Sequence, residues 1–197
     1  MIALILNLAC IAPDQEGVDS FAPSDEFEEA VDKEPVEIDE STHARSKTCY
    51  LDNDWTGSTG SSNCYAWESD FGTSWTYSSS TSWEYYYDDV EYTTSDDSQW
   101  GYYWTAPGNG TATFYAWVPS NHATGDANYY YYCAYSSSDV YYKNKKVNQD
   151  DYYGDWVKLG SRTATSGYTC GVILTKHDDA TSSEQVAADG MKIVFSY

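Results

Sequence analysis

The chain has 197 residues, and 41% of them are hydrophobic, with 21 Tyr and 8 Trp but only 5 Phe and 2 Met. Its 31 acidic and 10 basic side chains give a formal net charge of −21, which argues against nucleic acids and anionic lipid surfaces as partners. The sequence has no run of about 18 apolar residues, so it predicts no membrane-spanning helix. These features are typical of a secreted, aromatic-rich β protein.

Residues 1–10 resemble the end of a bacterial lipoprotein signal, in which a cysteine is lipidated after cleavage. The short apolar run MIALILNLA leads directly to Cys10 and carries no Lys or Arg. The run is at the short end of the roughly 7–15 residues usual for a signal core. We expect export, with Cys10 lipidated, or unmodified if the segment is an ordinary export signal.

Residues 11–47 are predicted to form a disordered acidic linker. They hold 12 acidic and 3 basic residues, with Pro13, Pro23 and Pro35 spread among them. Low hydrophobicity and like-charge repulsion leave too little apolar burial to offset the chain entropy lost on folding. A docked propeptide or a helix around residues 25–32 is the alternative.

Residues 48–197 are predicted to form one all-β domain. Short runs rich in Tyr, Trp, Val, Ile and Thr alternate with clusters of Gly, Asn, Asp and Ser, and helical periodicity is lacking. About eight to ten strands favour an antiparallel two-sheet β-sandwich, of a jelly-roll and galactose-binding-like kind, with a closed barrel as the alternative. The predicted strands are 74–80, 82–94, 99–106, 110–120, 127–138, 155–164, 168–177 and 191–197.

Alternation along three of these strands predicts which side chains share a face. The first set is Phe114, Ala116 and Val118, opposite Tyr115 and Trp117; the second is Val172 and Leu174, opposite Ile173; the third is Tyr129, Tyr131, Cys133 and Tyr135.

The order of these segments resembles the golvesin C-terminal domain, also described as the carbohydrate-binding-like domain of xanthan lyase. The resembling pieces, in chain order, are LDND, FGTSW, SSSTSWEYYYDDVEYTT, WGYYWTAPGNGTATFYAWVPS, NHATGDANYYY, DWVKLGS and VAADGMKIVF. The resemblance covers residues 48–197 and implies an extracellular, non-catalytic β-sandwich module with polysaccharide as its expected ligand. The departures are four cysteines, the high Tyr content, and Gly190 where the family usually has Ala.

Four cysteines in this domain, Cys49, Cys64, Cys133 and Cys170, indicate two disulfides. An even number in an exported chain favours disulfides, and the absence of a CxxC spacing excludes a zinc ribbon or thioredoxin-type motif. Three pairings are possible. Cys49–Cys64 with Cys133–Cys170 is favoured because each bond would tie a strand to a nearby strand or loop; four buried thiols are the alternative.

Acidic and amide side chains near the start of the domain form a candidate calcium site. Carboxylate, amide and carbonyl oxygens within one turn are the ligands that hard cations prefer. The candidate ligands are Asp52, Asn53 and Asp54, completed by Asp178, Asp179 or Asp189 from the other end of the chain. Plain turn residues that solvate a sheet edge are the alternative.

Motifs for catalysis are missing from the sequence, which has no GxSxG, GxGxxG, P-loop or HExxH pattern. His43 lies in the linker, and His122 and His177 are expected to be solvated loop residues. Adjacent acidic pairs are frequent, but a charge of −21 scatters such pairs without a glycosidase site. We therefore predict that the chain is not an enzyme.

Aromatic side chains are the remaining candidates for ligand contact, because Trp and Tyr rings stack on the apolar faces of sugars. Runs such as WEYYYDDVEY and the YY pairs at 102–103 and 141–142 cannot all face inward on alternating strands. The predicted ligand-binding residues are Trp83, Tyr85, Tyr87, Tyr102, Tyr130, Tyr132 and Tyr152. Aromatic pairs that only stabilise a sheet are the alternative, and the residues expected in the core are Trp55, Trp75, Trp104 and Trp156.

The sequence therefore predicts an extracellular or cell-surface binding module on an acidic tether, with polysaccharide as partner and calcium as the one candidate cofactor. Any membrane contact is expected only through a lipid on Cys10. The alternative is a structural subunit of a cell-surface layer, fibre or adhesion complex that self-associates through aromatic surfaces. A small hydrolase is the third possibility and would show two carboxylates facing each other in a cleft.

Overall fold

The structure is a computed structural model that describes residues 45–53, 66–71, 74–79 and 89–197. Two single-turn 3-10 helices are η2 (Ser137–Asp139) and η3 (Gln149–Asp151). The strands are β1 (Ser46–Leu51), β2 (Ala66–Phe71), β3 (Thr76–Ser79), β4 (Asp89–Thr93), β5 (Gln99–Thr105), β6 (Gly110–Val118), β7 (Asp126–Ala134), β8 (Lys143–Asn148), β9 (Asp155–Ala164), β10 (Thr169–Lys176), β11 (Val186–Ala188) and β12 (Met191–Ser196). Across these ranges, the structure contains no helix long and apolar enough to cross a bilayer.

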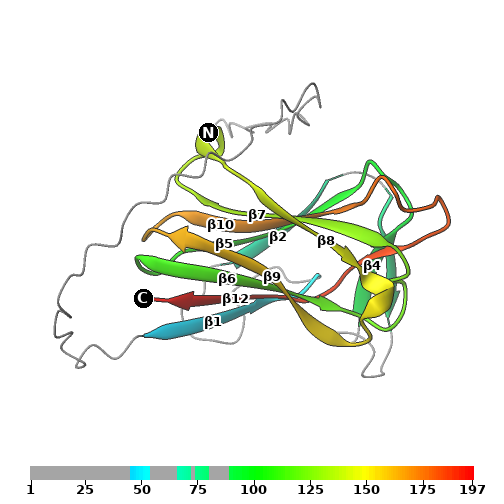
Figure 1. Ribbon diagram of the computed structural model, residues 1–197, viewed down its shortest axis with the longest axis horizontal. Helices are drawn as coiled ribbons and strands as arrows, with labels where there is room; N and C mark the ends of the chain where they lie inside the picture. The colour runs from blue at the N-terminus through cyan, green and yellow to red at the C-terminus, as the bar shows by residue number, and fades with distance from the viewer. Residues whose placement is uncertain (1–44, 54–65, 72–73, 80–88) are drawn as a thin grey trace, which may run out of the picture. The chain divides into compact units, whose positions relative to one another are not determined.

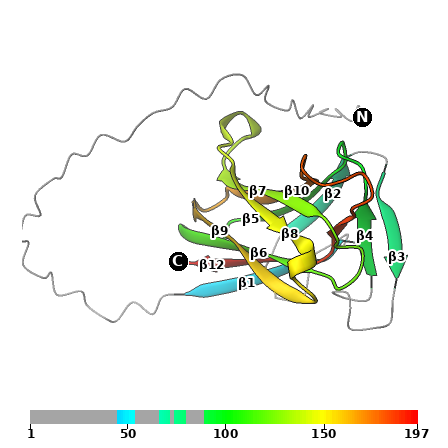
Figure 2. The same cartoon turned by 45° about the vertical axis from the view of Figure 1, so that its right-hand side comes forward.

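Most of the strands belong to two antiparallel sheets that lie one over the other (Figure 1). Sheet A has the strand order β1-β12-β6-β9, and sheet B has the order β2-β5-β10-β7-β8. Sheet C, with the order β11-β4-β3, stands at one end of these two layers (Figure 2). The chain passes from sheet B to sheet A between β5 and β6, returns at β7, and repeats this exchange at β9 and β10. This order confirms the predicted jelly-roll sandwich, and the closed-barrel alternative is wrong.

The core lies between sheets A and B and is built from alternate residues of their strands. Phe114, Ala116 and Val118 of β6 are buried while Tyr115 and Trp117 point outward, as predicted. Phe114 packs on Tyr131 of β7, with ring centroids 5.5 Å apart, and this contact joins the two layers.

The same alternation holds in sheet B, with one exception. Val172 and Leu174 are fully buried inside while Ile173 lies on the other face of β10. Tyr129 and Tyr131 are buried on the inner face of β7. The exception is Tyr135, which follows the end of β7 and is largely exposed, so it does not share the buried face of Tyr129 and Tyr131 as predicted.

Four strands lie outside the predicted set: β1, β2, β8 and β11. β1 begins at Ser46, so Ser46 and Lys47 belong to the folded domain rather than to the predicted linker. β8, with the sequence KNKKVN, has Val147 as its one buried apolar side chain. It is an edge strand of sheet B, where lysines discourage pairing with another chain. In the predicted strand 82–94, residues 89–93 form β4, and residues 82–88 lie outside the described residues.

The favoured disulfide between Cys133 and Cys170 is present and joins β7 to β10. The two residues are directly opposite in the strand register, with Cα atoms 4.0 Å apart. Cys49 is also disulfide-bonded, so the alternative of four free thiols is wrong. Its favoured partner, Cys64, lies outside the described residues, and that pairing stays a prediction.

Replacing both Cys133 and Cys170 with alanine is expected to lower the free energy of unfolding by about 2–4 kcal/mol. The bond closes a loop between residues 37 apart in sequence, which restricts the unfolded chain. Urea denaturation of the parent and the double variant, without reductant, measures this loss. Coincident transitions would show that the bond adds nothing to stability.

Candidate functional site

The outer face of sheet B carries aromatic side chains aligned across its strands. The register places Trp67 of β2 beside Tyr103 of β5, Tyr103 beside Gly171 of β10, and Gly171 beside Tyr132 of β7. Trp67 stacks on Tyr103 with ring centroids 5.4 Å apart. At the other side Tyr132 meets Tyr142, which precedes β8, edge-on at 5.2 Å. We call Trp67, Tyr103, Tyr132 and Tyr142 the sheet-B row.

Two glycines let the rings of this row lie low over the backbone. A Cβ atom at Gly171 would lie 2.8 Å from Cε1 of Tyr132 and 2.9 Å from Cδ1 of Tyr103, closer than side chains tolerate. A Cβ atom at Gly101 would lie 2.6 Å from Cζ of Tyr103. The residues at the centre of the row, Tyr103 and Tyr132, are 9% and 8% exposed, whereas Trp67 and Tyr142 are 37% and 43% exposed. The row therefore has a buried middle and two accessible ends.

The structure places only part of the predicted ligand-binding set on this face. Tyr132 belongs to the row, and Tyr130 lies beside it with its ring 6.5 Å from that of Tyr142. Tyr102 is fully buried and donates a hydrogen bond to the carbonyl of Asp189, so its predicted surface role is wrong. Tyr152 is partly buried against the core. The residues outside the described ranges are Trp83, Tyr85 and Tyr87.

A second aromatic group covers the outer face of sheet A and surrounds a lysine. Lys192 of β12 is in register with Tyr50 of β1 and Tyr115 of β6. Its Nζ atom lies 4.6 Å from the ring centroid of Tyr115 and 4.4 Å from that of Trp156. The Trp156 ring also contacts Trp117 at 5.5 Å and Tyr50 at 5.9 Å. We call Tyr50, Tyr115, Trp117, Trp156 and Lys192 the sheet-A cluster.

The tryptophans expected in the core divide between the interior and this surface. Trp104 is buried, as expected, and Trp75 is partly buried against the core. Trp156 instead stands on the outer face of sheet A, because Val157 and Leu159 occupy the inward positions of β9. Trp55 lies outside the described residues.

The structure brings two parts of the candidate calcium site together: the residues after β1 and the residue before β12. Asp52, Asn53 and Asp189 are all buried, and the pairing of Leu51 with Met191 sets the end of β1 beside the start of β12. Asp54 lies outside the described residues. In the described ranges, no group of three or more His, Cys, Asp or Glu side chains is arranged to hold a metal ion. Calcium binding therefore stays a prediction.

The other candidate ligands, Asp178 and Asp179, lie in the exposed loop that follows β10 rather than beside Asp52. Asp179 pairs with Lys146 at 3.2 Å, and its carboxylate lies 3.4 Å from Nδ1 of His177. The carboxylate of Asp179 is therefore engaged with Lys146 and His177.

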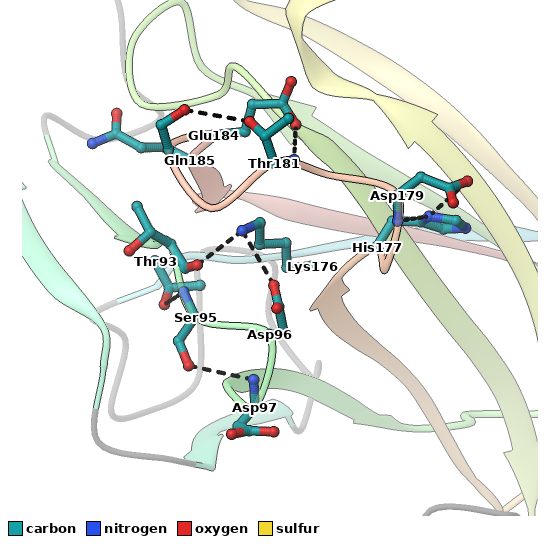
Figure 3. Close-up of polar contacts among 12 residues, drawn as sticks. Thr93, Ser95, Asp96, Asp97, Lys176, His177, Asp179, Thr181, Glu184 and Gln185 are labelled. Atoms are coloured by element: carbon teal, nitrogen blue, oxygen red, sulfur yellow. Dashed lines mark hydrogen bonds and ion pairs between the residues drawn. The ribbon is translucent and has the colours of Figure 1, made fainter.

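Polar contacts hold the loops at this end of the sandwich (Figure 3). The buried side chain of Lys176 donates to the carbonyl of Thr94 at 2.9 Å and pairs with Asp96 at 3.1 Å. In the loop after β10, the backbone N–H of Asp179 donates to Nδ1 of His177. These interactions fasten the β4–β5 turn and the loop after β10.

The two described histidines are thus loop residues, but they are only partly exposed and both have partners. His122 stacks on Tyr92 with centroids 3.9 Å apart, and its Nδ1 lies 3.1 Å from Oε1 of Gln185. His177 contacts Asp179 as described. The expectation that both are simply solvated is wrong, and each is used to shape its loop.

Comparisons with known proteins identify the fold. No protein-family model matches the sequence, and no curated protein matches it. The structure is similar to part of xanthan lyase from Paenibacillus, with a TM-score of 0.55 and 21% identity over 75% of this chain. The K1 cleaved adhesin domain of Lys-gingipain from Porphyromonas gingivalis matches with a TM-score of 0.37 and 13% identity, over 76% of this chain and 95% of that domain. The chain spans 13% of the length of the xanthan lyase, with which it shares a β-sandwich fold.

Proposed function

We propose that this chain is an extracellular, non-catalytic module of the golvesin type that binds polysaccharide through the sheet-B row. The single observation that carries the proposal is the alignment of four aromatic rings across neighbouring strands, with glycine beneath the central two. Strands in a sheet are about 4.8 Å apart, so the row from β2 to β8 extends over roughly 19 Å. An extended sugar chain can lie along such a row and contact both exposed ends.

Further observations support the separate parts of this proposal. Disulfides form and persist in oxidising compartments, which supports an extracellular location. The similarity to a small part of a lyase supports a module that is joined to, or derived from, larger polysaccharide-processing proteins. The histidine and lysine contacts at the loop end are used to hold loops, which supports the absence of catalysis.

Replacing Trp67 or Tyr142 with alanine is expected to weaken polysaccharide binding about tenfold or more, because each removes an exposed ring from one end of the row. Affinity electrophoresis of the full chain against a panel of soluble polysaccharides measures the change. Tyr153→Ala is the matched control, since it removes an exposed tyrosine elsewhere. Equal retardation of all variants, or no retardation by any polysaccharide, would refute the proposal.

Self-association is the second candidate function and is favoured by the segment between β7 and β8. Tyr135 and Tyr141 in this segment are largely exposed. The guanidinium carbon of Arg162 lies 5.4 Å from the ring centroid of Tyr141. Exposed rings of this kind can pack against a second copy. A sedimentation coefficient that rises with protein concentration would favour this function over polysaccharide binding.

A further inference from the structure

Lys192 in the sheet-A cluster is held by aromatic rings rather than by a carboxylate. Its ammonium lies over the rings of Trp156 and Tyr115, an arrangement stabilised by cation–π attraction. The ion pairs among the described residues involve Lys146, Lys176 and His177, and none of them involves Lys192. What sets Lys192 apart among the described lysines is therefore its place over two aromatic rings.

The rings around Lys192 also affect its pKa. Partial burial among them lowers the pKa of Lys192, because water is removed from the ammonium, while the charge of Asp155 acts in the opposite direction. Asp155 is thus the acidic group whose charge reaches Lys192, but it lies beyond ion-pair distance. An anion that bound at the ammonium would replace the lost hydration and raise the pKa again.

A second lysine lies on the same face, one strand further along. Tyr115 pairs with Lys192 on one side and with Lys158 of β9 on the other, so the two lysines flank this ring. Two strand spacings put their Cα atoms about 10 Å apart. Lys158 is exposed, and like Lys192 it takes part in none of the ion pairs of the described residues. Its carbonyl accepts a hydrogen bond from the ammonium of Lys145, which adds a third positive charge nearby.

We propose that the sheet-A cluster is a binding site for the carboxylate or sulfate group of an acidic saccharide. The anionic group pairs with Lys192 and Lys158, and the carbons of its sugar ring contact the aromatic rings of the cluster that the ammonium does not cover, Tyr50 and Trp117. The net charge of −21 does not prevent this, because charges more than about 8 Å away are largely screened at physiological salt. A cationic ligand is disfavoured, since Lys192 itself occupies the faces of Trp156 and Tyr115.

This site is separate from the sheet-B row, and its test can succeed or fail independently. The probes are polygalacturonate and its methyl-esterified form for carboxylates, with dextran sulfate and dextran for sulfates. Calorimetry with the full chain is expected to show binding of at least one charged polymer, much weaker binding of its uncharged counterpart, and a loss of affinity between about 50 and 500 mM NaCl.

Lys192→Met is expected to weaken binding of the charged polymer about five- to tenfold, since it keeps the length of the side chain and removes the ammonium. Lys192→Arg is expected to retain binding, and Lys158→Met provides a second variant if Lys192→Met does not fold. Lys143→Met is the control, because it makes the same charge change on the edge strand of sheet B. In the parent, nuclear magnetic resonance should show the pKa of Lys192 rising when the polymer binds.

Three outcomes would overturn the proposal. They are equal affinity for the charged and uncharged polymers, equal loss of affinity in the Lys192→Met and Lys143→Met variants, and no binding of any acidic polymer. A fourth outcome would also overturn the sheet-A site: loss of binding in Trp67→Ala or Tyr142→Ala, with Lys192→Met unaffected, would support the sheet-B row alone.

Discussion

Replacing Gln149 with leucine is expected to lower the free energy of unfolding by about 3–5 kcal/mol. Gln149 is fully buried, and its Nε2 donates to the hydroxyl of Tyr129 at 2.7 Å and to the carbonyl of Ala187 at 3.0 Å. Its Oε1 accepts from the backbone N–H of Ala187 at 2.9 Å. Because β11 is an edge strand of sheet C, the amide of Gln149 pairs with Ala187 as a neighbouring strand would.

Leucine fills a similar volume but cannot form these bonds. The variant therefore buries an N–H and a carbonyl without partners, each of which costs about 1–3 kcal/mol. Such a loss is a large part of the 5–15 kcal/mol typical of a whole domain. Urea denaturation measures the change. Gln185→Leu is the matched control, because the Gln185 side chain is only partly buried and contacts His122. Similar losses in the two variants would show that the buried network adds no special stability.

The stability of the domain is expected to fall as the pH rises above about 10, and Tyr129 is a main cause. Burial raises the pKa of the Tyr129 hydroxyl far above its ordinary value of 10.0, and the nearby Asp189 adds to the shift, although the bond from Gln149 opposes it. Above pH 10 the unfolded chain releases this proton while the folded chain retains it. Because of this group, the free energy of unfolding falls by about 1.4 kcal/mol for each pH unit above 10. Below pH 10 the stabilisation that Tyr129 contributes is fully present.

Tyr129→Phe tests this linkage. At pH 8 the variant is expected to be less stable than the parent by about 1 kcal/mol, because Gln149 loses one acceptor. Between about pH 10 and 11.5 the difference should fall through zero and then reverse, at a rate approaching about 1.4 kcal/mol per pH unit, since the variant has no proton to retain. Tyr135→Phe removes an exposed hydroxyl instead and serves as the control. Parallel pH profiles for the parent and Tyr129→Phe would contradict the prediction.

The sequence predicts the fold well where one face of a strand is apolar and the other is not. In β6 the inward positions are Phe114, Ala116 and Val118, and alternation identifies them directly. In β5 both faces carry large aromatic residues, so Tyr102 and Tyr103 were indistinguishable by residue type. Trp100 and Trp104 share the face of Tyr102, however, and this clustering of large rings is the signal that could have placed Tyr102 in the core.

The candidate surfaces depend on pairing between distant strands, which local patterns do not encode. The alternation of Val157 and Leu159 could have placed Trp156 on the outer face, but nothing local shows that Lys192 lies over its ring. Likewise β8 has too few apolar residues to be predicted as a strand, because it lies at an edge and pairs with β7 alone. Register across a sheet is set by the whole core rather than by a short stretch of sequence.

The bond between Cys133 and Cys170 also determines what happens when the chain is cut. The exposed segment that contains Tyr135 and Tyr141 lies between these cysteines and offers aromatic cleavage sites to digestive proteases. A cut there produces two fragments, but each keeps one of the bonded cysteines, and the fragments remain covalently linked. The cleaved molecule can therefore persist as a two-chain protein, with both sheets still paired, until a reductant separates its halves.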